Sequence, residues 1–264
     1  GSLAAMVGLL PASLPAPLTP PPLTPGIGPR RGKVALMTGC VQSVLRPGVT
    51  EAALRVLAAN GVEVVVPPDQ GCCGALALHA GARARGEALA AAHRHRFPAD
   101  VDAVVTTAAG CGSSMKATHT GGAPVLDVLE YLDRLGLVTP LALPAPMRVA
   151  YQDACHLAHA QQVTEAPRRL LRAVAGLTLV PLADGGLCCG SAGLYNLEQP
   201  ALAAGLGRRK AQAIAASGAA IVATANIGCL TQMQASLTAG GHTVEVCHVV
   251  ELLDMAAARP REPQ

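Results

Sequence analysis

The feature that most constrains this chain is a pair of adjacent cysteines followed by glycine, which occurs twice, as Cys72-Cys73-Gly74 and as Cys188-Cys189-Gly190. Consecutive Cα atoms lie about 3.8 Å apart, less than the roughly 4.4 Å that a disulfide normally needs, so a bridge within either pair would be strained. In a regular strand the two thiols would point to opposite faces. They can converge on one site only where the backbone bends, and the glycine supplies the freedom for that bend. Each pair is therefore predicted to lie in a loop.

Single cysteines flank each pair at matching distances. Eight of the nine cysteines fall into two groups, the first and second cysteine sets: Cys40, Cys72, Cys73 and Cys111, then Cys155, Cys188, Cys189 and Cys229. In the first and second sets, 31 and 32 residues separate the first cysteine from the pair, and 37 and 39 residues separate the pair from the last cysteine. Core cysteines have no reason to recur in register, so we interpret the sets as metal ligands. The ninth, Cys247, lies outside the pattern and is expected to be a core residue.

The chain around the cysteines is duplicated as well. Residues 128–133 (Val-Leu-Glu-Tyr-Leu-Asp) have their counterpart in 249–254 (Val-Val-Glu-Leu-Leu-Asp). Corresponding cysteines are 115 to 118 residues apart, a period that indicates two domain-sized lobes rather than a solenoid of short repeats. We predict a first lobe over residues 30–140 and a second over 147–258, joined by a Pro-rich hinge at 140–146.

Within each lobe, apolar runs typical of buried strands alternate with helical patterns. We expect strands at 34–37, 62–66, 101–106 and 148–151, and helices at 49–59, 83–96 and 125–135. This alternation predicts an α/β fold of two duplicated lobes, each a small parallel-sheet βα domain. Every cysteine of a set would then follow the carboxyl end of a strand, the edge where open α/β sheets bind ligands. The two resulting crests, which are the sheet edges that carry the cysteine sets, are expected to face each other across a pseudo-twofold axis.

Residues 1–29 differ in composition from the lobes. Eight prolines in this segment predict an extended linker that cannot pack a core of its own. Its apolar opening lacks the positive residues of a secretory signal, and no apolar run reaches the roughly 18 residues that span a bilayer. A net charge of +3 is too small and too scattered to favour a nucleic-acid partner. We expect a cytoplasmic protein, or one peripheral at the inner face of a membrane.

Four thiolates at one crest can be explained by zinc, by disulfides or by an iron–sulfur cluster. Structural zinc typically uses Cys-x-x-Cys spacing, and an adjacent pair is awkward for one tetrahedral ion. Disulfides suit secreted chains, and a fold of this size does not need them. A cluster contains several irons, so two adjacent thiolates can bind two of them. The ligand pattern therefore favours a cluster over zinc.

The segments around the cysteines resemble the CCG-type cysteine-rich domain pair that heterodisulfide reductase shares with the iron–sulfur subunits of flavin-dependent dehydrogenases. They are most similar to the glycolate oxidase iron–sulfur subunit. The segments that carry the resemblance are 38–42, 70–76, 151–159, 187–193 and 226–232. Heterodisulfide reductase has a fifth cysteine three residues after the last one, where this chain has Ser114 and Gln232, so a five-cysteine site is not expected.

The resemblance implies that both cysteine sets bind iron–sulfur clusters of the 4Fe-4S type. His156, beside Cys155, and His248 are candidates to hydrogen-bond a cluster sulfur. No G-x-G-x-x-G or phosphate-loop fingerprint is present, so flavin is expected on a partner. In this family a ferredoxin-like domain with further clusters precedes the Pro-rich linker, and that domain is missing from this chain.

We therefore expect an iron–sulfur electron-transfer subunit of a flavin-dependent glycolate (2-hydroxy acid) dehydrogenase complex. It would relay electrons from a flavoprotein partner towards quinone and would be inactive on the substrate when isolated. Two alternatives stay open. One is a thiol/disulfide reductase component whose cysteine pairs exchange with a thiol substrate, and the other is a zinc-stapled interaction scaffold without a redox role.

Overall fold

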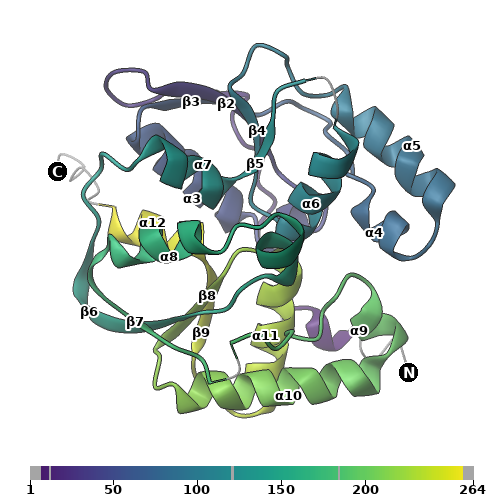
Figure 1. Cartoon of the computed structure of the whole chain (residues 1–264), viewed down its shortest axis with the longest axis vertical. Coiled ribbons are helices and arrows are strands. Elements are labelled where there is room, and N and C mark those ends of the chain that lie inside the picture. The colour runs from purple at the N-terminus through teal and green to yellow at the C-terminus, as the bar shows by residue number, and fades with distance from the viewer. Residues whose placement is uncertain (1–6, 12, 120–121, 184, 258–264) are drawn as a thin grey trace.

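Short runs of aliphatic residues form the strands of two separate sheets (Figure 1). The computed structural model describes residues 7–11, 13–119, 122–183 and 185–257. In it the first sheet has the strand order β1-β3-β2-β4-β5 and the second the order β7-β6-β8-β9. All neighbouring strands are parallel except β1, which pairs antiparallel with β3. The predicted α/β fold of two duplicated lobes is confirmed.

The two lobes repeat one order of elements. The first lobe consists of β1 (Leu23–Thr24), β2 (Gly32–Met37), α2 (Gln42–Leu45), α3 (Gly48–Ala59), β3 (Val62–Val65), α4 (Ala75–His79), α5 (Arg83–Arg94), β4 (Ala103–Thr106), α6 (Ala109–Thr118), β5 (Val125–Asp127) and α7 (Val128–Leu135). The second consists of β6 (Ala142–Tyr151), η1 (His156–Ala160), α8 (Glu165–Arg172), β7 (Ala175–Val180), α9 (Tyr195–Glu198), α10 (Pro200–Ala216), β8 (Ile221–Thr224), α11 (Ile227–Ala239), β9 (Glu245–His248) and α12 (Val249–Ala256). The series from β6 to α12 matches the series from β2 to α7, with the π-helical turn η1 in place of α2.

The expected helix at 125–135 is wrong at its start. Val125–Asp127 is strand β5, paired in parallel with residues 104–106 of β4. The helix begins only at Val128, because Asp127 is its N-cap and forms a capping box with Glu130. Short strands that run directly into a helix show no separate periodicity, so the sequence pattern merged the two elements.

The expected hinge at 140–146 is also corrected. Residues 142–146 form the start of β6, which shifts its register against β7 between Ala142 and Met147. Pro144 and Pro146 are tolerated because β8 pairs with β6 only from Val149 onward, so this part of β6 has one neighbouring strand and an irregular ladder.

Part of the predicted Pro-rich linker packs on the first lobe. Leu23–Thr24 adds the edge strand β1 to the first sheet, and the backbone N–H of Val66 donates to Pro22 O over 2.9 Å. Ile27 N–H donates in the same way to Ala58 O, at the end of α3, over 2.8 Å. The linker residues 1–6 and 12 lie outside the described residues.

Helices from both lobes fill the space between the two sheets (Figure 1). Here α3 packs against α12, and α7 against α8. Two ion pairs related by the duplication join these helices, Arg55 with Asp254 and Arg169 with Asp133, each with an Nε to Oδ1 distance of 2.9 Å. Buried residues of both lobes belong to one continuous core. The lobes are therefore packed as one body rather than joined by a flexible hinge.

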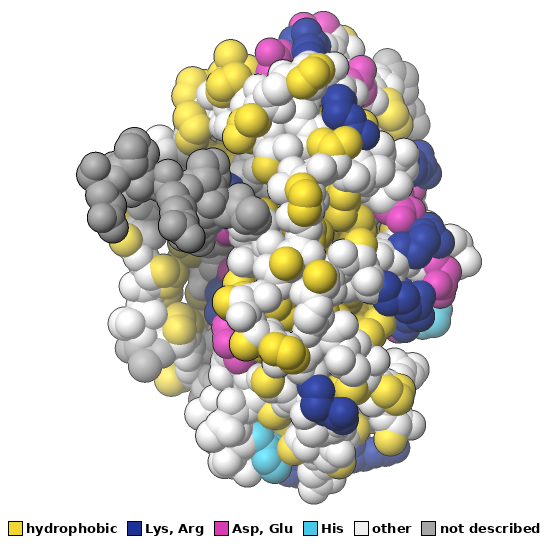
Figure 2. Space-filling view, turned by 90° about the vertical axis from the view of Figure 1, so that its left-hand side faces the viewer, with side chains coloured by type: hydrophobic (Ala, Val, Ile, Leu, Met, Phe, Trp, Pro, Cys, Tyr) yellow, Lys and Arg dark blue, Asp and Glu magenta, His cyan; other side chains and the backbone are white. Residues whose placement is uncertain are grey.

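Charge is scattered over the surface drawn in Figure 2, where Lys and Arg side chains alternate with acidic and apolar ones. This face presents no continuous basic surface, in keeping with the net charge of +3. Among the described residues, no helix combines the length and the apolar character needed to cross a membrane.

Replacing Asp127 by Asn should remove a pH dependence of stability. Asp127 is fully buried, and burial raises the pKa of its carboxyl to about 7, whereas an unfolded Asp ionises near about 3.9. Between these values only the unfolded state loses the proton, so raising the pH favours unfolding, by about 1.4 kcal/mol per pH unit at most. Urea unfolding should show the wild-type protein losing stability relative to Asp127→Asn between about pH 4 and pH 7. Parallel profiles of stability against pH for the two proteins would contradict the raised pKa of Asp127.

Candidate metal centre

Both cysteine sets open onto one cavity between the lobes, with a volume of about 250 Å³. Seven of the eight cysteines contribute to its lining: Cys40, Cys72, Cys73, Cys111, Cys155, Cys189 and Cys229. Cys188 lies beside Cys189 and contacts Cys155. The two predicted crests thus face each other, as expected, and they share a single cavity.

The first cysteine set comes from two loops and the first turn of a helix at the carboxyl edge of the first sheet. Cys40 follows β2 and is exposed, whereas Cys73 is buried in the loop between β3 and α4. Cys111 lies in the first turn of α6 rather than in a loop. The Sγ atoms of Cys40 and Cys72 are 3.6 Å apart. The predicted bend is present, because Gly74 has a φ of 82° and its N–H donates to Cys72 Sγ over 3.4 Å.

The second set repeats this arrangement with more burial. Cys155 precedes η1, the pair 188–189 lies in the loop between β7 and α9, and Cys229 lies in the first turn of α11. The N–H of Gly190, at a φ of 97°, donates to Cys188 Sγ over 3.4 Å. Asn226 donates from Nδ2 to Cys229 Sγ over 3.6 Å. Such N–H donors stabilise thiolates and are typical surroundings of sulfur ligands.

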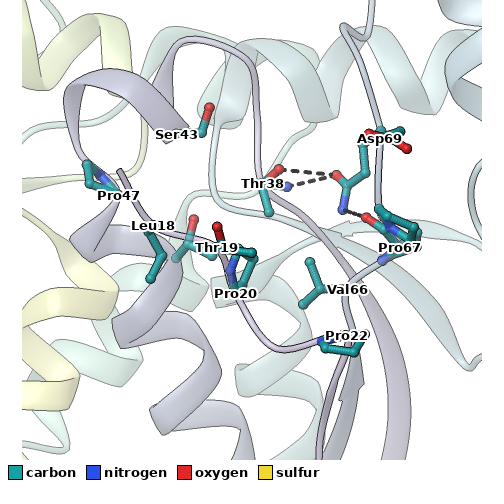
Figure 3. A pocket seen from close by; sticks show the side chains of 13 residues that line it. Leu18, Thr19, Pro20, Pro22, Thr38, Ser43, Pro47, Val66, Pro67 and Asp69 are labelled. Carbon is teal, nitrogen blue, oxygen red and sulfur yellow. Dashed lines mark hydrogen bonds between the residues drawn. The ribbon is translucent and has the colours of Figure 1, made fainter. Parts of the chain in front are cut away.

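Sequence analysis missed two buried glutamines that hold the cysteine loops together. Gln70 accepts from Thr38 N–H over 3.0 Å and donates to the carbonyls of Leu36 (2.9 Å) and Pro67 (3.1 Å). It ties the loop of Cys40 to the loop of Cys72. Figure 3 shows the hydrogen bonds at Thr38 and Pro67, beside a cavity of about 410 Å³ that the Pro-rich segment helps to line.

In the second lobe a glutamine again joins the two cysteine loops. It lies in the loop of the single cysteine, whereas Gln70 lies in the loop of the pair. Gln152, three residues before Cys155, donates from Nε2 to the carbonyl of Leu187, directly before Cys188, over 3.3 Å. Both glutamines stand inside the cysteine segments 70–76 and 151–159. Their position there was the one available signal, and spacing alone does not reveal a cross-loop hydrogen bond.

Contacts within each set shift the thiol pKa values in opposite directions. The contact with Cys111 lowers the pKa of Cys73 to about 7, and the pKa of Cys111 rises in return. The contacts with Cys155 and Cys189 place the pKa of Cys188 well below its usual range. Each set therefore contains a thiol that loses its proton readily, as a metal ligand must.

The donor chemistry of both sets fits an iron–sulfur cluster. Four soft sulfur ligands, with N–H groups directed at two of them in the second set, are the surroundings that such clusters use. Within the described part of the chain, no group of three or more His, Cys, Asp or Glu side chains is arranged to bind a single metal ion. A cluster does not require that arrangement, because its irons spread over several sulfurs.

The candidate His156 lies at the cavity, together with a histidine that sequence analysis did not single out. The Nδ1 of His156 is 3.6 Å from Cys155 Sγ. Its ring meets that of His79, at the end of α4 in the other lobe, edge to face with a centroid distance of 5.0 Å. Burial lowers the pKa of His156, and the neighbouring His79 lowers it further. The pair brings one imidazole from each lobe to the cavity.

The structure contradicts the expectation that His248 hydrogen-bonds a cluster sulfur. Its Nδ1 accepts from Val250 N–H over 3.0 Å as the N-cap of α12, and its Nε2 lies 2.9 Å from Thr107 O in the first lobe. Both ring nitrogens are thus used by the backbone, leaving none for a cysteine sulfur. Cys247 is buried in β9 and belongs to the hydrophobic core, as expected.

Comparison with known proteins identifies the cysteine-bearing regions. Residues 34–116 and 149–234 each match the family model described as CCG, cysteine-rich domain. The chain is 33% identical over 255 residues to the "Probable glycolate oxidase iron-sulfur subunit" of Bacillus subtilis, covering 90% of this chain and 57% of that protein. It is 34% identical over 243 residues to the "Glycolate oxidase iron-sulfur subunit" of Escherichia coli, covering 85% and 58%.

A third relative has a different name. A subunit of the "Fumarate reductase (CoM/CoB)" of Methanothermobacter marburgensis is 35% identical over 229 residues, which cover 85% of this chain and 46% of that protein. The chain thus spans about half the length of these three relatives. Among solved structures, a hypothetical protein from Helicobacter pylori matches with a TM-score of 0.50 and 13% identity, over 98% of this chain and 54% of that chain. That likeness concerns the fold alone.

Replacing Cys189 by Ser should lower metal content and stability together, because ligand binding at such a site is coupled to folding. The matched control is Cys247→Ala, which removes a buried sulfur from the core and should keep the iron content of the wild-type protein. Iron analysis and thermal unfolding of anaerobically prepared protein measure both effects. Equal iron loss in the two variants would show that Cys247 is a ligand and that the assignment of the sets is wrong.

Proposed function

The chain belongs to the CCG cysteine-rich domain family, and from that premise we propose that it is the iron–sulfur electron-transfer subunit of a flavin-dependent glycolate (2-hydroxy acid) dehydrogenase. It takes electrons from a flavoprotein partner and passes them towards quinone. The observation that carries the proposal is the convergence of two four-cysteine sets on one cavity. Relatives named as glycolate oxidase iron–sulfur subunits support it.

In this proposal each cysteine set binds one cluster of the 4Fe-4S type. The ligands are Cys40, Cys72, Cys73 and Cys111 in the first lobe, and Cys155, Cys188, Cys189 and Cys229 in the second. When bound, such a cluster accepts and donates single electrons. The chain's own residues hold it: backbone N–H groups of Gly74 and Gly190 donate to cysteine sulfur, and exposed Cys40 brings the first set close to the surface.

Substrate oxidation is assigned to a partner. Hydride abstraction from a 2-hydroxy acid needs a cofactor that can accept it, and the 264 residues contain no dinucleotide or phosphate-loop fingerprint to hold one. A ferredoxin-like domain with further clusters would complete the route. The location that fits this role is the cytoplasm, with the complex peripheral at the inner face of the membrane that holds the quinone.

A thiol/disulfide reductase is the second candidate. It is favoured by the 3.6 Å approach of the Cys40 and Cys72 sulfurs and by the relative whose name includes CoM/CoB. In that case the thiols themselves would react with a thiol substrate, and the cavity would be its binding site. The glutamines and N–H donors that fix the sulfurs favour the relay, because a ligand site needs fixed sulfurs.

Protein reconstituted anaerobically with iron and sulfide should contain iron and labile sulfide and should absorb in the visible, because eight gathered cysteines supply enough thiolates for two clusters. Metal and sulfide analysis of the same preparation gives the result directly. Stoichiometric zinc without labile sulfide would instead support the zinc-stapled scaffold.

The reconstituted chain alone should not oxidise glycolate, and dye reduction driven by glycolate should require the flavoprotein and the ferredoxin-like partner. In the assembled complex, Cys189→Ser should lower electron transfer to quinone while the flavoprotein's own reduction by glycolate continues. The control variant Cys247→Ala should transfer electrons like the wild-type protein. Glycolate oxidation by the isolated chain would contradict the relay, and failure to bind any flavoprotein would favour the thiol reductase.

A further inference from the structure

The helices that carry the last cysteine of each set, α6 and α11, meet at the interface between the lobes. The N–H of Ala109, the first residue of α6, donates to the carbonyl of Ala225 over 3.2 Å. The next N–H, that of Gly110, donates to Asn226 Oδ1 over 3.2 Å. The first N–H groups of a helix have no acceptor within that helix. Two of these groups in α6 are therefore satisfied by the other lobe.

Asn226 does not use its side chain as its position predicts. It is the N-cap residue of α11, where an Asn side chain normally accepts a hydrogen bond from the backbone of its own helix. Asn226 makes no such bond to α11. Its Oδ1 accepts from Gly110 of α6 instead, and its Nδ2 donates to Cys229 Sγ over 3.6 Å. One carboxamide thus contacts the helix of the first set and a sulfur of the second.

The bond from Gly110 determines which end of the carboxamide faces the sulfur. A backbone N–H can only donate, so the atom that receives it is the amide oxygen. The amide nitrogen is then left on the side of Cys229, where it acts as a donor. Gly228 leaves room for this arrangement, because a Cβ at that position would lie 3.3 Å from Asn226 Nδ2 and 2.6 Å from Ser191 Oγ.

The first lobe has a different residue at the equivalent position. Cys111 and Cys229 correspond across the duplication, and three residues before them stand Ala108 and Asn226. Ala108 is also an N-cap residue with an extended backbone, but its methyl group cannot donate a hydrogen bond. The duplicated scaffold therefore places a side-chain donor beside the last cysteine of the second set and an apolar group beside that of the first.

We propose that Asn226 is a positioning residue for the second cysteine set: the first lobe holds its carboxamide in place, and its N–H group makes the cluster of the second set easier to reduce. The inference rests on the proposed function. Each electron that the flavoprotein partner gives up adds one negative charge to the cluster and its ligand sulfurs. A donor directed at one of these sulfurs stabilises that charge and raises the midpoint potential. The potential of the second set therefore depends on a contact with the first lobe.

The test is a redox titration, followed by electron paramagnetic resonance, of the whole chain reconstituted with iron and sulfide. Asn226→Ala gives the second lobe the residue of the first. Asn226→Asp keeps an oxygen for the Gly110 N–H and replaces the donor by a second oxygen. The matched control is Asn196→Ala, because Asn196 lines the same cavity and donates to Gln232 Oε1 over 3.1 Å rather than to a sulfur.

We expect two titrating components in the wild-type protein, of which Cys189→Ser removes the one that belongs to the second set. In Asn226→Ala this component should change its oxidised-to-reduced ratio by about threefold to tenfold, which moves its midpoint potential by about 28 to 59 mV to more negative values. It should move further than the other component. Asn226→Asp should shift it at least as far, because a carboxylate oxygen then faces the sulfur. Asn196→Ala should leave both midpoints unmoved.

Other results would overturn the inference. An unmoved second component in Asn226→Ala, equal shifts of both components in that variant, or the same shift in Asn196→Ala would show that Asn226 serves packing between the lobes alone. If Asn226→Ala does not retain the second cluster, Asn226→Asp decides, because it keeps the bond to Gly110: a shifted midpoint supports the inference, and an unmoved midpoint or loss of the cluster overturns it. These outcomes leave the proposed relay intact, since the wild-type protein would still contain two clusters. Wild-type protein that binds no iron would overturn the relay and this inference together.

Discussion

The close approach between each cysteine-pair glycine and the helix behind it is the constraint on which the site depends. At Gly74 and Gly190 a side chain would collide with helix backbone, and both residues have positive φ. Only glycine permits this geometry. It turns two adjacent thiols towards one side, directs a backbone N–H at the first sulfur, and fixes α5 and α10 beneath the pairs.

Pairing of the lobes converts two cysteine sets into one site. The ion pair of Arg55 with Asp254 has a counterpart in that of Arg169 with Asp133, and His248 spans the interface by capping α12 while it contacts Thr107 O. Single surface ion pairs contribute little, so the shared apolar core carries most of the cohesion. Its effect is to hold the carboxyl edges of both sheets around a common cavity.

The sequence predicted the spacing of the two cysteine sets, the loops of the cysteine pairs and the duplicated α/β lobes because these follow from local spacing and periodicity, whereas Cys111 and Cys229 lie in helices. It did not separate β5 from α7, because a three-residue strand has no period of its own. It placed His248 with the site, whereas the fold uses that ring as a cap. The roles of Gln70 and His79 depend on contacts between loops or lobes, which no single-chain pattern encodes.

The duplication gives two copies of one site. The two copies share their backbone geometry and differ in their side chains. The glycine contacts are preserved in both lobes. The cysteines around them differ in exposure: Cys40 is exposed whereas its counterpart Cys155 is half-buried, and Cys229 is buried whereas its counterpart Cys111 is half-buried. Cys229 also accepts a hydrogen bond from Asn226. Equal backbones therefore hold two sets of sulfurs in unequal surroundings, because the side chains beside each set changed while the glycine geometry that positions the pairs did not.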